Sequence, residues 1–167
     1  MSIQTKTEIL SKAHQKDTFS CGETSLDVYL KNYASQDLKR RVSGVFVLTN
    51  DNHDIQGYYT LSSSSIIAEE LPEKFIKKFP TYTHLPVTLI GRLAVDKKYQ
   101  GKGLGETLLL DALLRSYNVS KEIGSIAVIV DALHEQAARF YQSYGFISLP
   151  SQRKLFIPMK TIGQIFK

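Results

Sequence analysis

The chain has 167 residues, a length that suits one domain built around one hydrophobic core. Hydrophobic residues make up 43% and charged residues 22%, both ordinary for a globular domain, and no apolar run approaches the about 20 residues that span a bilayer. The single cysteine excludes an internal disulfide and a multi-cysteine metal site, and the N-terminus has no secretory-signal pattern. We therefore expect a single domain over residues 1–167, without a membrane segment, in the bacterial or general cytoplasm.

The charge balance is mildly positive. There are 21 Lys and Arg against 16 Asp and Glu, which leaves a net charge of +5 and a sequence pI of about 9.2. Such a surplus suits an anionic partner, such as a phosphate-bearing cofactor or a nucleic acid. Charge alone does not decide the matter, because many basic domains bind no polyanion.

The sequence of the first half predicts three strands, one long helix and one short helix. Residues 3–10 are expected to form a strand, and residues 43–49 and 55–65 an antiparallel hairpin. A short helix is predicted over 71–79. The longer helix is predicted over 24–39, because apolar side chains recur there at helical spacing, namely Leu26, Tyr29, Leu30, Tyr33 and Leu38.

The second half alternates strands and helices. The predicted elements are a strand over 85–95, a loop over 96–103, a helix over 104–117, a strand over 124–130, a helix over 134–144 and an antiparallel pair over 146–149 and 154–159. Together the elements indicate a mixed α/β (α+β) sheet with a strand–helix–strand unit in its second half.

The strongest local signal is the run Tyr99-Gln-Gly-Lys-Gly-Leu-Gly-Glu106, between a predicted strand and a predicted helix. Glycines let the backbone turn sharply and approach a ligand closely, and the N–H groups at a helix start attract phosphate. Lys102 adds a positive charge. A pyrophosphate-binding loop is therefore expected, although a loop that merely turns the chain has the same composition.

Two common phosphate loops do not match this run. A P-loop requires Gly-x-x-x-x-Gly-Lys-Ser/Thr, which is absent. A Rossmann loop requires Gly-x-Gly-x-x-Gly, whereas Gly101, Gly103 and Gly105 alternate at every second position.

The pattern Gln-x-x-Gly-x-Gly, at Gln100, Gly103 and Gly105, resembles the coenzyme A loop of the GNAT (Gcn5-related) acetyltransferases. The strand before it, Arg92-Leu-Ala-Val-Asp96, and the later segment Ala138-Arg-Phe-Tyr-Gln-Ser-Tyr-Gly-Phe146 resemble further signatures of that family. The resemblance extends over roughly residues 3–160. It implies a GNAT fold with a mixed, mostly antiparallel sheet flanked by helices, and acetyl-CoA as cosubstrate. The residues that it assigns to cofactor binding are Leu93, Ala94, Val95, Gln100, Gly101, Lys102, Gly103, Leu104, Gly105 and Glu106.

Several segments resemble one subgroup, the GNAT toxins of bacterial type II toxin–antitoxin systems. These are Phe19-Ser-Cys-Gly, Gly57-Tyr-Tyr-Thr-Leu-Ser62, Gly91-Arg-Leu-Ala-Val95 and Val130-Asp-Ala-Leu133. The resemblance implies transfer of acetyl to the α-amino group of aminoacyl-tRNA, which inhibits translation. It also implies a ribbon-helix-helix antitoxin, a repressor complex with it, and a homodimer. Many GNAT enzymes carry Asn after the strand that follows the loop helix, whereas this chain has Asp131-Ala-Leu-His134 there, a form that resembles the toxin subgroup.

The chemistry of acetyl transfer assigns few side chains. A free α-amino group has a reference pKa of about 7.7–8.0, and an ester on the same carbon lowers it, so water suffices to remove the proton. A backbone N–H of the 93–95 strand is expected to stabilise the oxyanion. Tyr141 matches the family's general acid, since a phenol stays protonated at neutral pH and protonates the leaving thiolate. Two alternatives stay open: Tyr141 only packs its ring in the core, or Tyr144 is the general acid.

Candidate substrate residues are basic. Arg92 holds either a substrate phosphate or a structural carboxylate, and both interpretations stay open. Lys39, Arg40 and Arg41 are expected to contact tRNA phosphates, unless they form an ordinary solvated surface. The four histidines have no metal-ligand spacing, so no metal is expected. Cys21 precedes a helix, where a thiolate is sometimes activated, but a structural role is favoured.

Three other functions remain open. The enzyme alternative is a GNAT acetyltransferase acting on a small amine or a protein N-terminus. The others are a non-catalytic binding module that keeps the fold, and a nucleic-acid-binding regulator.

Overall fold

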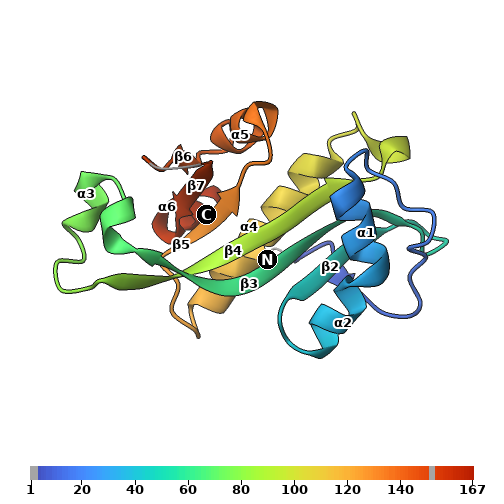
Figure 1. Ribbon diagram of the computed structural model, residues 1–167, viewed down its shortest axis with the longest axis horizontal. Helices are drawn as coiled ribbons and strands as arrows, with labels where there is room; N and C mark the ends of the chain where they lie inside the picture. Colours follow the sequence, from blue (N-terminus) through green and yellow to red (C-terminus); the bar gives the residue numbers. More distant parts are fainter. Residues whose placement is uncertain (1–3, 151–152) are drawn as a thin grey trace. The chain divides into compact units, whose positions relative to one another are not determined.

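The computed structural model describes residues 4–150 and 153–167 and shows a seven-stranded sheet in the order β1-β2-β3-β4-β5-β7-β6 (Figure 1). The strands are β1 Glu8–Ile9, β2 Gly44–Thr49, β3 Ile55–Ile67, β4 His84–Val95, β5 Ala127–Asp131, β6 Ile147–Ser148 and β7 Lys154–Pro158. The α-helices are α1 Thr24–Asn32, α2 Ala34–Lys39, α3 Glu73–Ile76, α4 Leu104–Ser120, α5 Glu135–Gln142 and α6 Met159–Ile165. Two 3-10 helices complete the elements, η1 Ala68–Glu70 and η2 Lys97–Tyr99. Among the described residues, no helix combines the length and the apolar character that crossing a membrane requires.

The strand pairing confirms a mixed, mostly antiparallel sheet. β1 with β2, β2 with β3, β5 with β7, and β6 with β7 are antiparallel. β4 and β5 are parallel, with Thr88 opposite Val128. Parallel neighbours need a long crossover, and α4 supplies it between β4 and β5. The predicted strand–helix–strand unit is therefore present.

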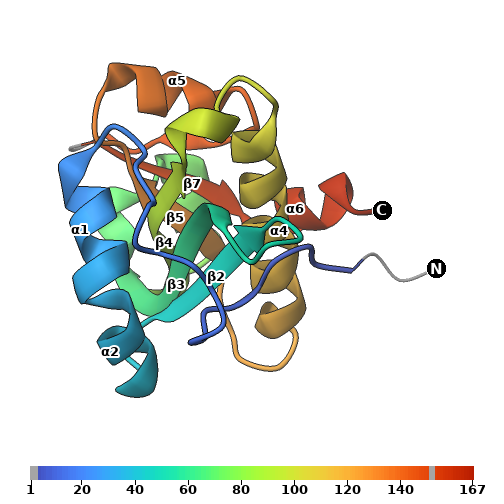
Figure 2. The ribbon, with the colours of Figure 1, turned by 90° about the vertical axis from the view of Figure 1, so that its right-hand side faces the viewer.

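The chain divides into two compact units. The first contains the described residues up to Ser62 together with Gly91–Arg115. Figure 2 shows α1 and α2 on one face of its strands and α4 on the other. Tyr58 and Leu30 are fully buried in its core, and the ring of Phe19 meets that of Tyr58 edge to face at 5.6 Å. The expectation of one domain over residues 1–167 stays a prediction.

The second unit contains Ser63–Ile90 and the described residues from Ser116 onward. Its core joins β5 and β7 to η1 and the start of β4, with Ile129, Phe156, Ala68 and Leu85 all buried. The apolar run of β5 is buried along Ala127–Val130, as expected for a strand covered on both faces.

Three predicted elements are wrong in detail. The helix predicted over 24–39 is two helices, because Tyr33 leaves helical geometry at φ −124° and is 54% exposed instead of facing the core. The strand predicted over 154–159 ends at Pro158, where α6 begins, and Met159 and Ile162 bury one face of α6. Of the strand predicted over 3–10, only Glu8–Ile9 pairs, and residue 3 lies outside the described part.

Candidate active site

The loop after β4 is anchored by two side chains. Asp96 is buried, and its carboxylate accepts hydrogen bonds from the backbone N–H groups of Lys98 (2.9 Å) and Ser20 (3.1 Å). The Gln100 side-chain amide donates to the carbonyl oxygens of Val95 (2.8 Å) and Cys21 (2.9 Å). Gln100 therefore holds the loop in place through its side chain, which binds two backbone carbonyl groups, and its predicted contact with the cofactor stays a prediction.

The glycines of the loop adopt conformations that other residues rarely reach. Gly101 has φ +78° and Gly103 has φ +80°, and a Cβ built on either glycine would meet open space. α4 starts at Leu104, and the first helical bond runs from the Thr107 N–H to the Gly103 carbonyl oxygen at 3.1 Å. The N–H groups of the preceding turn are left to bind a ligand, as at any helix start. This arrangement suits a phosphate group.

Two charged side chains flank the loop. The Lys102 ammonium lies 5.8 Å from the centroid of the Tyr99 ring and is exposed, so it is available to an anion. Glu106 is exposed on the first turn of α4, where a carboxylate favours the helix dipole but repels phosphate. A contact of Glu106 with the cofactor would therefore use its backbone N–H.

The strand before the loop, β4, carries Arg92, whose side chain stacks on the ring of Tyr29. Its guanidinium lies 3.4 Å from the centroid of the Tyr29 ring, and the Tyr29 hydroxyl donates to Asp37 at 2.8 Å. Burial and then the bond to Asp37 raise the pKa of Tyr29 to about 12. The structural partner of Arg92 is thus an aromatic ring. Beyond Arg92 on β4, Ala94 is buried, while Leu93 and Val95 are half-buried.

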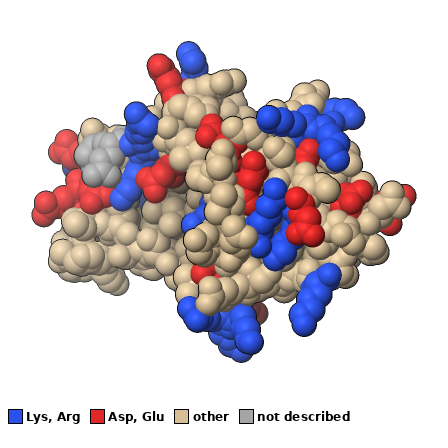
Figure 3. Space-filling model, turned by 45° about the vertical axis from the view of Figure 1, so that its right-hand side comes forward, with Lys and Arg blue, Asp and Glu red and all other residues tan. Residues whose placement is uncertain are grey.

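The other predicted substrate residues lie on the surface of the same unit. Lys39, Arg40 and Arg41 are exposed at the end of α2, where Arg41 has a left-handed φ of 62°. On the face that Figure 3 draws, Lys and Arg side chains form separate groups with Asp and Glu between them. Basic side chains of the second unit, such as Lys74 and Arg153, are also exposed.

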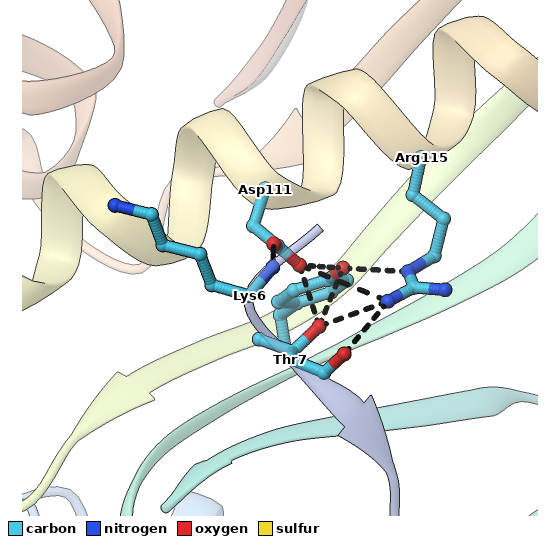
Figure 4. A network of polar contacts seen from close by, with 5 residues as sticks. Lys6, Thr7, Asp111 and Arg115 are labelled. Carbon is cyan, nitrogen blue, oxygen red and sulfur yellow. Dashed lines mark hydrogen bonds and ion pairs between the residues drawn. The ribbon is translucent and has the colours of Figure 1, made fainter. Parts of the chain in front are cut away.

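A buried polar network ties α4 to the N-terminal segment (Figure 4). The Asp111 carboxylate, 5% exposed, accepts hydrogen bonds from the Lys6 backbone N–H, the Thr7 hydroxyl and the Tyr59 hydroxyl. The Arg115 guanidinium donates to Tyr59 Oη at 3.0 Å and to the Thr7 carbonyl oxygen at 3.2 Å. Because the loop leads into α4, a network that fixes α4 to the N-terminal segment also positions the loop.

Tyr141 lies on α5, in the second unit. Its side chain is 9% exposed, and its ring packs against Phe140 and Phe146, each at a centroid distance of 5.3 Å. Burial raises the pKa of Tyr141 to about 12, so its phenol stays protonated well above neutral pH. Tyr144, the alternative candidate, is half-buried, and its ring centroid lies 5.2 Å from that of Phe140.

The structure brings most predicted site residues into one unit. Arg92 to Val95, the loop from Gln100 to Glu106, and Lys39 to Arg41 belong to the first unit, and Tyr141 to the second. The supporting residues Asp96 and Asp111 were not predicted. Asp96 had a local signal, since an acidic residue directly before a helical turn caps it. Asp111 had no such signal, because the residues that donate hydrogen bonds to it, Lys6, Thr7 and Tyr59, lie between 52 and 105 residues away in the chain.

Metal and thiol chemistry find no support in the described part of the chain. No three His, Cys, Asp or Glu side chains gather there in a way that would hold a metal ion. Burial, and further the neighbouring Asp27, raise the pKa of the Cys21 thiol to about 11, so it is not activated. His134 serves as N-cap of α5, where its Nδ1 accepts a hydrogen bond from the Ala137 N–H at 3.1 Å.

The sequence is similar to proteins of known type. The acetyltransferase (GNAT) domain family matches residues 41–148. A tRNA-acetylating toxin of Mycobacterium tuberculosis is 38% identical over 142 residues, which cover 85% of this chain and 84% of that protein. A probable toxin TacT of Sinorhizobium fredii is 33% identical over 161 residues, covering 91% and 89%.

Several solved structures have the same fold as this protein over nearly the whole chain. A Tyr-to-Phe variant of KacT superposes with a TM-score of 0.91 at 33% identity, covering 98% of this chain and all of that one. AtaT in complex with acetyl-methionyl-tRNAfMet gives 0.90 at 32% identity, with the same coverage. A Tyr-to-Phe variant of the AtaT toxin bound to the C-terminus of the antitoxin AtaR and to acetyl-CoA gives 0.83 at 30%, covering 96% and 97%.

Proposed function

Since the chain belongs to the family of GNAT acetyltransferases, we propose that it is a toxin that transfers acetyl from acetyl-CoA to the α-amino group of aminoacyl-tRNA and thereby inhibits translation. The observation that carries this proposal is the loop of Gly101 and Gly103, whose left-handed backbone leads directly into the start of α4. The similarity of the chain to a tRNA-acetylating toxin, and to AtaT bound to acetyl-methionyl-tRNAfMet, supports aminoacyl-tRNA as the acceptor.

The loop binds the pyrophosphate of acetyl-CoA in this proposal. The first N–H groups of α4 have no carbonyl partner within the helix, a Cβ built on Gly101 or Gly103 would meet open space, and the helix dipole adds a favourable potential for anions. Lys102 pairs with a phosphate oxygen. The backbone of Leu93, Ala94 and Val95 receives the pantetheine arm, and one N–H of this strand stabilises the oxyanion.

Acetyl transfer then needs one proton from the protein. The neutral amine attacks the thioester carbonyl, so that the C–N bond forms, and the C–S bond breaks when the tetrahedral intermediate collapses. Water takes the proton that the amine loses. Tyr141 donates its phenolic proton to the departing thiolate, for which its pKa of about 12 keeps it ready across the physiological range.

The basic side chains of the first unit hold the tRNA backbone in this proposal. Arg92 is pre-oriented by the Tyr29 ring at 3.4 Å, which lowers the entropy lost when it pairs with a phosphate. Lys39, Arg40 and Arg41 add exposed charges at the end of α2. The acceptor is in the bacterial cytoplasm, where we expect the enzyme to act.

The proposed partners follow the relatives. AtaT binds the C-terminus of the antitoxin AtaR, and KacT occurs in a complex with DNA. We expect this chain to pair with an antitoxin that has a ribbon-helix-helix DNA-binding domain, to form a repressor complex with it, and to be a homodimer. A co-purified antitoxin that binds its own promoter with the toxin would support this assignment.

The direct test is acetyl transfer with labelled acetyl-CoA and a full panel of charged tRNAs. We expect label on the α-amino group of at least one aminoacyl-tRNA and none on the same tRNA uncharged. Turnover of small amines or peptide N-termini, with every charged tRNA inert, would assign the alternative acceptor class. Absence of acetyl-CoA binding in calorimetry would contradict the enzyme assignment altogether.

Replacing the second loop glycine should weaken cofactor binding. In Gly103→Ala the new methyl group meets no protein atom, so its effects are the strain of a left-handed alanine, about 1–2 kcal/mol, and occupation of the space meant for phosphate. We expect the Kd for acetyl-CoA to rise about tenfold or more in calorimetry. Gly124→Ala is the matched control, because Gly124 also faces open space but has no positive φ. Equal affinity of the Gly103 variant and the parent would contradict the loop assignment.

Removing the Arg92 side chain should weaken the binding of tRNA and leave the binding of acetyl-CoA unchanged. For Arg92→Ala we expect the KM for charged tRNA to rise several-fold and the slope of log affinity against log salt to fall by about one. Arg92→Lys should recover part of the loss, since it keeps the charge without the planar stack on Tyr29. Lys12→Ala, at another exposed cation, controls for net charge. A change confined to the KM for acetyl-CoA would contradict the assignment.

A further inference from the structure

The second unit has an apolar pocket that the proposed acetyl transfer does not use. Its volume is about 260 Å³, and its walls come from α3 and the turn after it, the start of β5, the end of β7 and the first turn of α6. Phe75, Phe79, Phe156 and Ile126 line it, and the rings of Phe75 and Phe156 meet edge to face at 5.1 Å. A dry cavity of about 150 Å³ already accommodates benzene, so this pocket is large enough for a substituted aromatic ring or a short alkyl chain.

Two cations lie at this pocket. Lys78 and Lys160 both line it and are exposed, and the Lys78 ammonium lies 5.5 Å from the centroid of the Phe75 ring. Lys74 approaches the same ring at 5.1 Å, so the aromatic wall gathers positive charge. Among the described residues, no Asp or Glu lines the pocket.

This combination selects a class of ligand. An apolar interior rewards burial of a hydrocarbon group, while polar groups placed deep inside would lose their water without compensation. The lysines favour a negative charge at the end of the ligand that stays in contact with solvent. We propose that the pocket binds a small organic carboxylate with a short aromatic or alkyl body, the body against Phe75, Phe79 and Phe156 and the carboxylate at Lys78 and Lys160.

The probe for this site is 3-phenylpropanoate, with 3-phenylpropanol as its uncharged counterpart. We expect the carboxylate to give saturable NMR shifts at the Ile126 methyl groups and the amides around Phe75, with an affinity of about millimolar. The alcohol should bind more weakly at the same place. Acetyl transfer is not needed for this measurement, so its outcome is independent of the proposed function.

Lysine variants separate the site from general attraction to a basic surface. Lys78→Ala and Lys160→Ala should each weaken carboxylate binding about two- to fivefold and leave the alcohol unchanged. Lys121→Ala is the matched control, because Lys121 is also an exposed lysine over a ring, that of Tyr117 at 4.8 Å, but does not line the pocket. Equal affinity for acid and alcohol, a loss in the control as large as in the pocket variants, or no saturable shifts with either probe would overturn the proposal.

Discussion

Tyr141→Phe lowers kcat for acetyl transfer by about 10²–10⁴-fold, the range that a positioned general acid contributes, while the KM values change little. The substitution removes one oxygen atom and keeps the ring that packs against Phe140 and Phe146, so the core around α5 is preserved. Without the phenol, the thiolate must leave without a proton. Pre-steady-state transfer of label from acetyl-CoA measures this step directly.

The expected pH profile has two limbs, and only the fall of the rate at high pH reports on Tyr141 as a proton donor. An acid acts only in its protonated form, and burial raises the pKa of Tyr141 to about 12, above its reference value. Ionisation of Tyr141 therefore leaves the rate unaffected until the pH approaches that value, and the rate falls only above it. The rise of the rate at lower pH instead follows deprotonation of the acceptor amine, at about pH 7–8.

Tyr144→Phe is the control for this prediction. Tyr144 contacts the same Phe140 ring, at 5.2 Å, so both variants remove a hydroxyl from the same aromatic cluster. We expect Tyr144→Phe to retain nearly the full rate. A larger loss in Tyr144→Phe than in Tyr141→Phe would transfer the acid role to Tyr144, and losses below threefold in both would exclude these two tyrosines as the acid.

Asp111→Ala destabilises the fold by about 3–5 kcal/mol, the range found when one member of a buried charged pair is removed. The buried carboxylate accepts hydrogen bonds from Lys6, Thr7 and Tyr59, and Arg115 Nη2 lies 3.9 Å from Asp111 Oδ2. Truncation leaves those donors without an acceptor and the guanidinium without its counter-charge.

Urea unfolding measures this loss as a lower midpoint at an unchanged slope. A graded series sharpens the result, because Tyr59→Phe removes one hydroxyl group, which donates to Asp111 and accepts from Arg115, and should destabilise by only about 1–3 kcal/mol. Asn118→Ala, at an exposed position of α4, should stay within about 0.5 kcal/mol of the parent. If Asp111→Ala is no less stable than Tyr59→Phe, the network does not hold α4 to the N-terminal segment.

The element order was largely predictable, and the errors have local causes. The stripe over 24–39 kept helical spacing across Tyr33, so periodicity gave no sign of the break between α1 and α2. α6 was missed because Pro158 and Met159 continued an apolar run that resembles a strand, and only the spacing of Met159 and Ile162 hinted at a helix.

The candidate loop was the most predictable part of the site. Gly101 and Gly103 need φ values near +80°, a requirement that glycine meets without strain and that therefore leaves a direct mark on the sequence. The helix that follows is likewise encoded in a local apolar pattern. The sequence alone thus determined the fold class, the family and the glycine-rich turn that leads into α4, since each leaves a pattern in neighbouring residues.

Only the tertiary structure decided what supports that loop. Arg92 rests on Tyr29 of another element, and Asp111 gathers Thr7 and Tyr59, which lie 104 and 52 residues away in the chain. No local pattern announces such contacts, because each of these residues is compatible with several environments. The decisive factor is burial, because a carboxylate removed from water is stable only where hydrogen-bond donors surround it. These donors come together only once the chain has folded.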